Sequence, residues 1–169
     1  MLEAIGLSAM KYPTIRKTAT PAGFTLIELI LTIMIAAVLA TLAAPSFREY
    51  IFNQKIRNAS FDLIATIGFA RSEAITRNAA VDIVPVSSAN WASGWAVRIG
   101  GADLRTQSAY SDLSITDPAT PAMLSYGNDG RPSTAFTATI APPTPISGVT
   151  SRCITIGLSG TAKSTLGGC

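Results

Sequence analysis

The chain has 169 residues, a formal net charge of +3 and no histidine. Its length suggests one domain plus a short apolar segment, and a charge this small does not support a general polyanion-binding surface. Without histidine the usual Ser/His and Cys/His catalytic arrangements and the usual zinc sites are excluded, and no phosphate-loop or dinucleotide motif occurs, so we expect no enzyme, no metal and no cofactor.

The first predicted element is a long apolar helix preceded by basic residues. Residues 1–23 carry three basic side chains against one acid, and the 21 residues from Phe24 to Ala44 contain a single charge, Glu28. At about 1.5 Å per residue, such a helix is about 30 Å long, which is the thickness of a bilayer core. Because flanking basic residues stay on the cytoplasmic side, we expect a membrane span that leads to an exported domain.

Two ordinary explanations of this segment leave features unexplained. A cleaved signal peptide has an apolar region of about 7–15 residues that ends at a small-residue cleavage site, whereas this run is longer and Ala44 is followed by Pro45. An uncleaved anchor accounts for the length but gives Glu28 no role. An acidic side chain in a membrane span costs about 2.5–3.5 kcal/mol on insertion scales, so Glu28 is a candidate functional residue.

The string GFTLIELILTIMIAAVLATLAAPSF, which begins at Gly23, resembles the N-terminus of type IV pilins and type II secretion pseudopilins. In that family a prepilin peptidase cuts after the glycine and methylates the new N-terminal phenylalanine. The resemblance therefore implies cleavage between Gly23 and Phe24 and N-methylation of Phe24. It also implies that Glu28 pairs with the N-terminal amine of a neighbouring subunit, which would offset its desolvation and set the register of assembly.

Beyond Pro45 the pattern predicts an amphipathic continuation of the helix. Apolar residues recur at steps of three to five residues, with charged and polar side chains between them. We expect Pro45 to kink one long helix and not to end it, because both sides read as helical. The helix should run to about Arg77, with Asn78 as its stop.

From Ala80 onward short strand-like segments alternate with turn signals. One long helix followed by several strands predicts an α+β fold in which an antiparallel sheet covers the helix. Trp91 and Trp95 are interpreted as packed side chains, with a surface aromatic patch as the alternative, and Gly94 between them predicts a tight turn. The expected strands are residues 81–86, 95–100, 104–110, 113–116, 123–127, 134–140 and 152–160.

Cys153 and Cys169 are the only cysteines and lie sixteen residues apart. Two free structural thiols are one interpretation. If the domain is exported, a disulfide that closes the C-terminal tail is favoured, and a loop of about 15 residues contributes about 3 kcal/mol in the chain-entropy model.

A second resemblance narrows the first. The strings FARSEAITRN and WASGWAVRI, a late GNDGRPS and the cysteine arrangement are similar to GspH/FimT-type pseudopilins. This implies a leader peptide over 1–23, a transmembrane and assembly helix over 24–45 and a periplasmic pilin-like domain over 46–169, with the helix ending near 78 and strands over 80–169. It also implies a single-pass inner-membrane protein that later joins a pilus tip outside the cell.

The resemblance leaves three functions open. A minor type IV pilin that joins the priming or tip complex of a pilus is favoured, and a GspH-like minor pseudopilin of a type II secretion system is second. The third is a DNA-binding minor pilin for DNA uptake in natural transformation. The implied partners are other minor and major pilins or pseudopilins, the prepilin peptidase and the inner membrane, with DNA as a weak partner.

The DNA hypothesis rests on few cations. FimT-like proteins that contact DNA do so through a basic G-R-x-R motif near the C-terminus, and the matching string here is GTAK, ending at Lys163. Residues 130–169 carry Arg131, Arg152 and Lys163 without an acid, and these are the candidate DNA contacts. One or two cations bind DNA only feebly, and the alternative is that Arg152 and Lys163 merely solubilise the tail.

Overall fold

The computed structural model describes residues 23–87, 90–116 and 122–169, so the predicted leader, except Gly23, lies outside the described residues. A boundary between two compact units falls between Ala40 and Thr41. The described residues form one helix and eight strands: α1 (Leu26–Arg77), β1 (Val81–Ser87), β2 (Asn90–Ile99), β3 (Ala102–Gln107), β4 (Ser114–Thr116), β5 (Leu124–Tyr126), β6 (Phe136–Ala141), β7 (Arg152–Ile156) and β8 (Ala162–Leu166).

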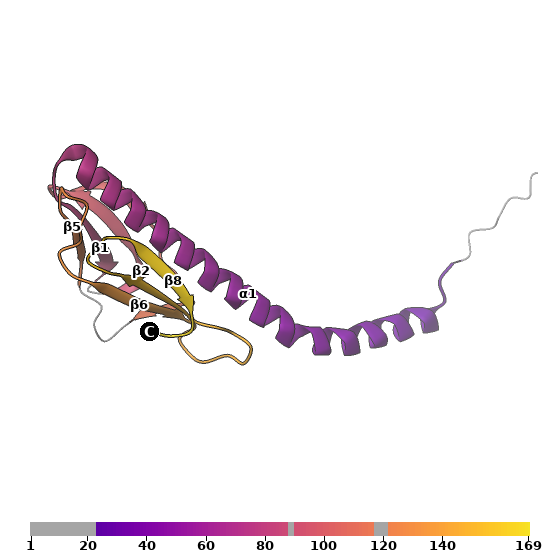
Figure 1. Ribbon diagram of the computed structural model, residues 1–169. Coiled ribbons are helices and arrows are strands. Elements are labelled where there is room, and N and C mark those ends of the chain that lie inside the picture. The colour runs from indigo at the N-terminus through magenta and orange to yellow at the C-terminus, as the bar shows by residue number, and fades with distance from the viewer. Residues whose placement is uncertain (1–22, 88–89, 117–121) are drawn as a thin grey trace, which may run out of the picture. The chain divides into compact units, whose positions relative to one another are not determined.

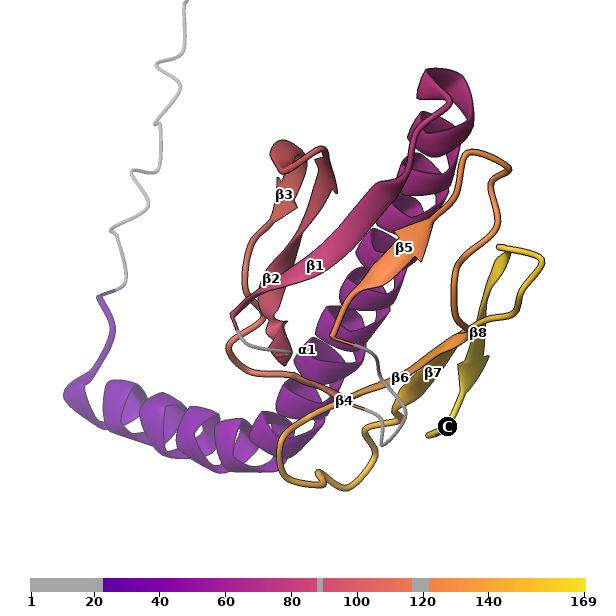
Figure 2. The same ribbon diagram turned by 90° about the vertical axis from the view of Figure 1, so that its left-hand side faces the viewer.

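The strands form two four-stranded sheets, in the orders β3-β2-β1-β5 and β4-β6-β7-β8 (Figures 1 and 2). Every neighbouring pair is antiparallel. The predicted α+β fold with an antiparallel layer is confirmed, and the layer consists of two sheets. Each expected strand overlaps an observed one, but β8 was not expected, because the prediction ended the last strand at residue 160.

The helix end follows the sequence prediction. α1 ends at Arg77, and Asn78 takes the left-handed conformation with φ of 50°. The Ala79 N–H donates to the Ala74 carbonyl at 3.2 Å, which satisfies one of the carbonyls left without a helical partner. Asparagine tolerates this conformation better than most residues, so Asn78 reverses the chain into β1.

One face of α1 and the inner faces of both sheets share a single core. The helix contributes side chains at three- and four-residue spacing, and three of them are alanines, which let the strands approach closely. Trp91 and Trp95 are fully buried, and the Trp91 ring packs edge-on against Phe136 with centroids 5.0 Å apart. The tryptophans are therefore packed side chains, and the surface-patch alternative is wrong. The buried apolar residues of the helix are Ile56, Ala59, Leu63, Ile67, Ala70 and Ala74, and Ser60 and Thr66 are its buried polar residues.

On one flank α1 is tied to the first sheet through polar contacts. The indole Nε1 of Trp95 donates to Thr66 Oγ1 at 3.0 Å, so the buried ring has a polar partner on the helix. The Tyr110 hydroxyl, just beyond β3, donates to the Asp62 carboxylate. These contacts set the rotation of the helix against the first sheet.

The other flank of α1 faces the second sheet and the loop before β7. The Asn53 amide donates to the Gly148 carbonyl, and its Oδ1 accepts from the Thr150 N–H, each at 3.0 Å. Further along, Arg71 Nη1 lies 3.4 Å from Thr161 Oγ1, in the loop just before β8. The part of α1 from Asn53 onward therefore packs against both sheets and bonds to the first sheet on one flank and to the loops before β7 and β8 on the other.

Gly94 does not form the predicted tight turn, because it lies within β2, which begins five residues earlier than expected. The burial of Trp91 draws the preceding polar segment into the strand. Gly94 has a positive φ of 87°, a conformation that favours glycine. A β-carbon at Gly94 would lie 2.3 Å from the Gln107 carbonyl oxygen, so the glycine permits close approach of β3.

We expect Gly94→Ala to destabilise the fold more than Gly101→Ala. Both glycines have nearly the same φ, 87° and 86°, so each alanine carries backbone strain of about 1 kcal/mol. Only at Gly94 must a neighbouring backbone also move, which adds about 2 kcal/mol. Urea unfolding of the detergent-solubilised chain, followed by tryptophan fluorescence, measures both losses, and equal losses would contradict the close-approach role.

Candidate functional site

The apolar half of α1 leaves its side chains exposed. Phe24, just before the helix, is 86 % exposed. Among the described residues α1 is the one helix long and apolar enough to cross a membrane, with a mean hydropathy of 2.5 over its most apolar window and none of that window buried. An apolar surface of this extent requires lipid or another protein around it.

Glu28 is held at the start of this helix by Thr25. Its Oε2 accepts from the Thr25 N–H at 3.0 Å and from the Thr25 hydroxyl at 2.9 Å, and its own N–H donates to Thr25 Oγ1 at 3.2 Å. This reciprocal arrangement is a capping box, in which Thr25 is the N-cap and the carboxylate reaches back one turn. The hydrogen bonds found among the described residues engage Oε2 and leave Oε1 unused.

Gly23 and Phe24 precede the helix in irregular, exposed backbone. A β-carbon at Gly23 would meet no atom within 4 Å, and its φ is not positive, so the packing and backbone of the described chain do not require a glycine there. Cleavage after Gly23 and methylation of Phe24 stay predictions.

α1 continues through Pro45, so the expectation that this proline does not end the helix is confirmed. The kink expected at Pro45 stays a prediction.

Cys153 and Cys169 form a disulfide, as the tail-closing interpretation expects. The Cys169 N–H also donates to Thr139 Oγ1 at 3.0 Å, on the strand that pairs with Cys153. The C-terminal tail is therefore tied across the outer face of the second sheet.

The three candidate DNA contacts are not brought together. Arg152 pairs with Leu166 across β7 and β8, whereas Lys163 pairs with Thr155. Because side chains alternate along a strand, Arg152 and Lys163 point to opposite faces of the sheet. Arg131 lies in a turn, with its Nε 4.0 Å from an Asp129 carboxylate oxygen. This geometry does not form a continuous basic patch from the three.

Outside the apolar half of α1, the side chains with shifted pKa values take part in structural contacts. Burial raises the pKa of Tyr110, which also donates to Asp62, and burial raises the pKa of Tyr126 to about 12. A hydrogen bond from Lys55 holds the pKa of the Asp112 carboxyl below its usual range. Among the described residues no group of acids and cysteines is placed to hold a metal ion.

Two features of these surfaces were missed by the sequence analysis. The first is the cap residue Thr25, which the spacing T-x-x-E could have indicated. The second is a pocket of about 230 Å³ lined by Asn53, Arg57, Thr150, Arg152 and Leu166. No sequence motif predicts this pocket, because α1, β7 and β8 meet there only after folding.

Two family models match the chain. That of the type II transport protein GspH matches residues 59–160, which is more than half of the chain. That of the prokaryotic N-terminal methylation motif matches residues 20–44 and so includes Gly23, Phe24 and Glu28. No curated protein sequence matches the chain significantly.

Solved structures share the fold at low sequence identity. The type IV minor pilin FimU of Pseudomonas aeruginosa aligns with a TM-score of 0.58 and 21 % identity over 66 % of this chain and 89 % of that one. A second crystal form of FimU gives 0.56 and 22 %, over 64 % and 91 %. The minor pseudopilin EpsH from the type 2 secretion system of Vibrio cholerae gives 0.50 and 13 %, over 66 % and 96 %.

We expect Thr25→Val to loosen the first turn of α1, because the valine side chain can neither accept from the Glu28 N–H nor donate to its carboxylate, and only the backbone N–H of residue 25 still donates to Oε2. Loss of an N-cap costs about 1 kcal/mol, so the Glu28 amide should exchange about fivefold faster in detergent micelles. Thr25→Ser is the matched control and should exchange at the wild-type rate. An unchanged rate in Thr25→Val would show that the cap contributes nothing.

Proposed function

Because the chain belongs to the family of the type II transport protein GspH and carries the N-terminal methylation motif, we propose that it is a minor type IV pilin. In this proposal a prepilin peptidase removes residues 1–23, residues 24–45 span the inner membrane, and residues 46–169 form the periplasmic domain. The processed chain then joins the priming or tip complex of a pilus. The GspH family contains minor pilins and pseudopilins, which are structural subunits of fibres.

The observation that carries the proposal is the environment of Glu28. Thr25 supplies hydrogen bonds to one carboxylate oxygen, Oε2. The charge itself has no cation partner among the ion pairs of the described residues. Cleavage before Phe24 creates a new ammonium group, which stays cationic after methylation. An ammonium from a neighbouring subunit fits Oε1 and offsets the cost of placing the acid in lipid.

Two observations support the membrane and periplasmic placement. The basic residues of 1–23 are expected to hold the N-terminus in the cytoplasm, so the chain beyond the span crosses. The Cys153–Cys169 disulfide suits an oxidising compartment such as the periplasm.

A second candidate is a minor pseudopilin of a type II secretion system, and the GspH family match favours it. The processing motif and the fold are the same in minor pilins and minor pseudopilins. The two functions therefore differ only in the fibre that the subunit joins, a pilus or the fibre of the secretion system. Deletion of the gene should remove surface pili and leave protein secretion intact if the pilin assignment is right. The reverse phenotype would assign the chain to secretion.

A DNA-uptake function has no comparable support, since Arg152 and Lys163 lie on opposite faces.

Processing can be read from the intact mass of the protein purified from its own membrane. The wild-type chain should have the mass of residues 24–169 with one added methyl group and one disulfide. Gly23→Leu should keep the full leader, because the peptidase requires the glycine. Gly6→Leu, which changes another leader glycine, is the control and should mature normally. A Gly23→Leu chain that reaches the wild-type mass would refute the assigned cleavage site.

A further inference from the structure

Among the described strands, β8 is one of the sheet edges and has no strand partner on its outer side. β8 pairs with β7 and ends the strand order of the second sheet. The Gly167 N–H donates to the Ser151 carbonyl at 2.9 Å, which marks this pair as hydrogen-bonded. Because bonded and non-bonded pairs alternate in an antiparallel ladder, the backbone groups of Ala162, Ser164 and Leu166 point away from β7. These groups can accept another strand.

The tail of the chain does not cover this edge. After Gly167 the backbone turns toward β6, where the Cys169 N–H donates to Thr139 Oγ1, and the Cys153–Cys169 disulfide fixes that path. Lys163 points to the outer face of the sheet, opposite to Leu166. The described tail therefore leaves the edge of β8 and the side chain of Leu166 accessible.

A stripe of α1 lies beside β8. Its ends are fixed by contacts, since Arg57 lines the same pocket as Leu166 and Arg71 lies against Thr161. Residues spaced by three and four share one face of a helix, so the residues between these ends face the same way. We call the stripe and strand together the α1–β8 face, which consists of Arg57, Phe61, Ile64, Gly68, Arg71 and residues 162–166.

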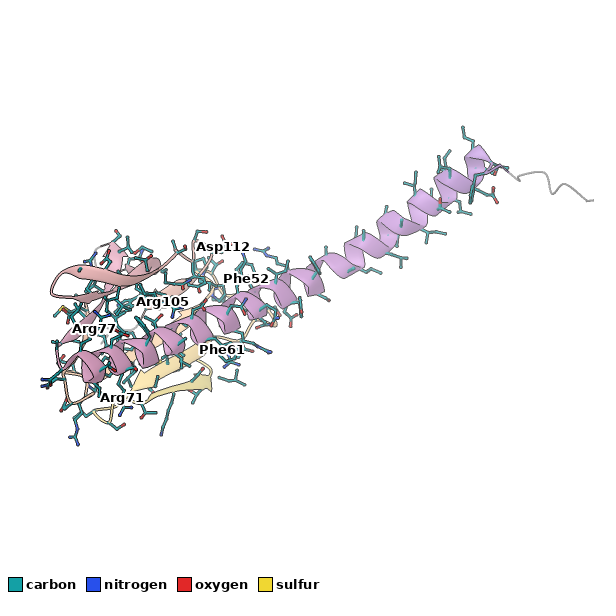
Figure 3. The ribbon with its side chains drawn as sticks, turned by 90° about the horizontal axis from the view of Figure 1, so that it is seen from above. Phe52, Phe61, Arg71, Arg77, Arg105 and Asp112 are labelled. Atoms are coloured by element: carbon teal, nitrogen blue, oxygen red, sulfur yellow. A yellow bond between two sulfur atoms is a disulfide. The ribbon has the colours of Figure 1, made fainter. Side chains whose placement is uncertain are left out.

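The centre of the α1–β8 face is apolar and open. Phe61 is 59 % exposed, and Leu166 of β8 is 71 % exposed; Phe61 and Arg71 lie on the same side of α1 (Figure 3). A β-carbon at Gly68 would meet no atom within 4 Å. Glycine within a helix costs about 1 kcal/mol relative to alanine, and the packing of the described chain does not require it here. A small residue at this point suits the close approach of another backbone.

A pocket with two arginines adjoins one end of the α1–β8 face, and in it Arg152 Nη1 donates to Ser164 Oγ at 3.2 Å. Arg57 and Arg152 line the pocket of about 230 Å³ with Asn53 and Leu166. Neither arginine takes part in the ion pairs found among the described residues, and residues 130–169 contain no acid. Guanidinium groups bind carboxylates through paired, charge-assisted hydrogen bonds. The pocket is therefore complementary to an acidic side chain.

We propose that the α1–β8 face binds an extended acidic segment of a neighbouring pilin-like subunit. The segment adds to β8 as a fifth strand, its apolar side chains cover Phe61 and Leu166, and a carboxylate enters the pocket between Arg57 and Arg152. Backbone bonding to an edge strand gives affinity, and the pocket gives specificity. The free backbone groups and apolar centre match a peptide and not a nucleic acid. The inference rests on the proposed function as a fibre subunit.

The test is photo-crosslinking in the full chain, in cells that make the protein. A photoreactive phenylalanine at position 166, in place of Leu166, should form an adduct with another pilin-like subunit. Mass spectrometry should map the adduct to an extended segment that contains Asp or Glu. Arg57→Gln and Arg152→Gln should each lower the adduct yield about tenfold, through loss of a charge-assisted contact. Arg105→Gln, an exposed arginine on the first sheet, is the matched control and should keep the yield.

Gly68→Leu separates docking from folding. The leucine enters open space and replaces a poor helix former, so thermal stability should be unchanged or higher. It also occupies the α1–β8 face, so the adduct yield at position 166 should fall. A Gly68→Leu chain with a full yield would overturn the proposal, as would equal effects of Arg57→Gln and Arg105→Gln.

A second crosslinking position distinguishes this inference from the proposed function. The same photoreactive residue in place of Ile35, in the apolar half of α1, should form adducts with other subunits if the chain assembles at all. Adducts at position 35 without adducts at position 166 would overturn the docking surface and leave the assembly role intact. Absence of both would refute both. Adducts of position 166 to nucleic acid, lipid or unrelated proteins alone would overturn the docking proposal.

Discussion

A carboxylate at the start of an apolar helix is costly unless hydrogen-bond donors and a cation surround it, and Glu28 is in this position. Thr25 meets part of the requirement, because its N–H and hydroxyl both bond to one carboxylate oxygen. The remaining oxygen and the net charge need a cation from outside the described chain. In the proposed fibre, the Glu28 carboxylate of each subunit pairs with the N-terminal ammonium group of a neighbour. The acid that is costly in lipid is therefore stabilised only when the subunit assembles.

The compact unit from Thr41 to Cys169 holds the sheets and the second half of α1 together through one shared core. α1 fills the core with small and branched side chains, while Thr66 on one flank bonds to Trp95 of the first sheet and Asn53 on the other bonds to the loop before β7. The disulfide ties the tail to the second sheet and leaves β8 open. Charged side chains are unevenly distributed along the chain, since residues 130–169 contain Arg and Lys but no Asp or Glu. A subunit in which a pocket with two arginines adjoins the edge strand β8 is suited to a directional contact and not to a symmetric one.

Local signals in the sequence were sufficient for the helix and for most strands. The end of α1 could be predicted because Asn78 is a residue that adopts the left-handed conformation, and α1 passes through Pro45 because both sides have strong helical patterns. β8 was missed because its residues, AKSTL, lack alternating apolar side chains, and Gly160 before it signals a turn. The division into two sheets and the meeting of Arg57 with Arg152 depend on long-range pairing, for which the sequence contains no local signal.

The most direct test of this role for Glu28 is the fraction of Glu28→Gln protein recovered in sheared fibres relative to the inner membrane. Glutamine preserves the capping box and removes only the charge. We expect a processed, membrane-inserted chain that is nearly absent from the fibre fraction. A Glu28→Gln chain that enters fibres as efficiently as the wild type would show that the charge does not direct assembly.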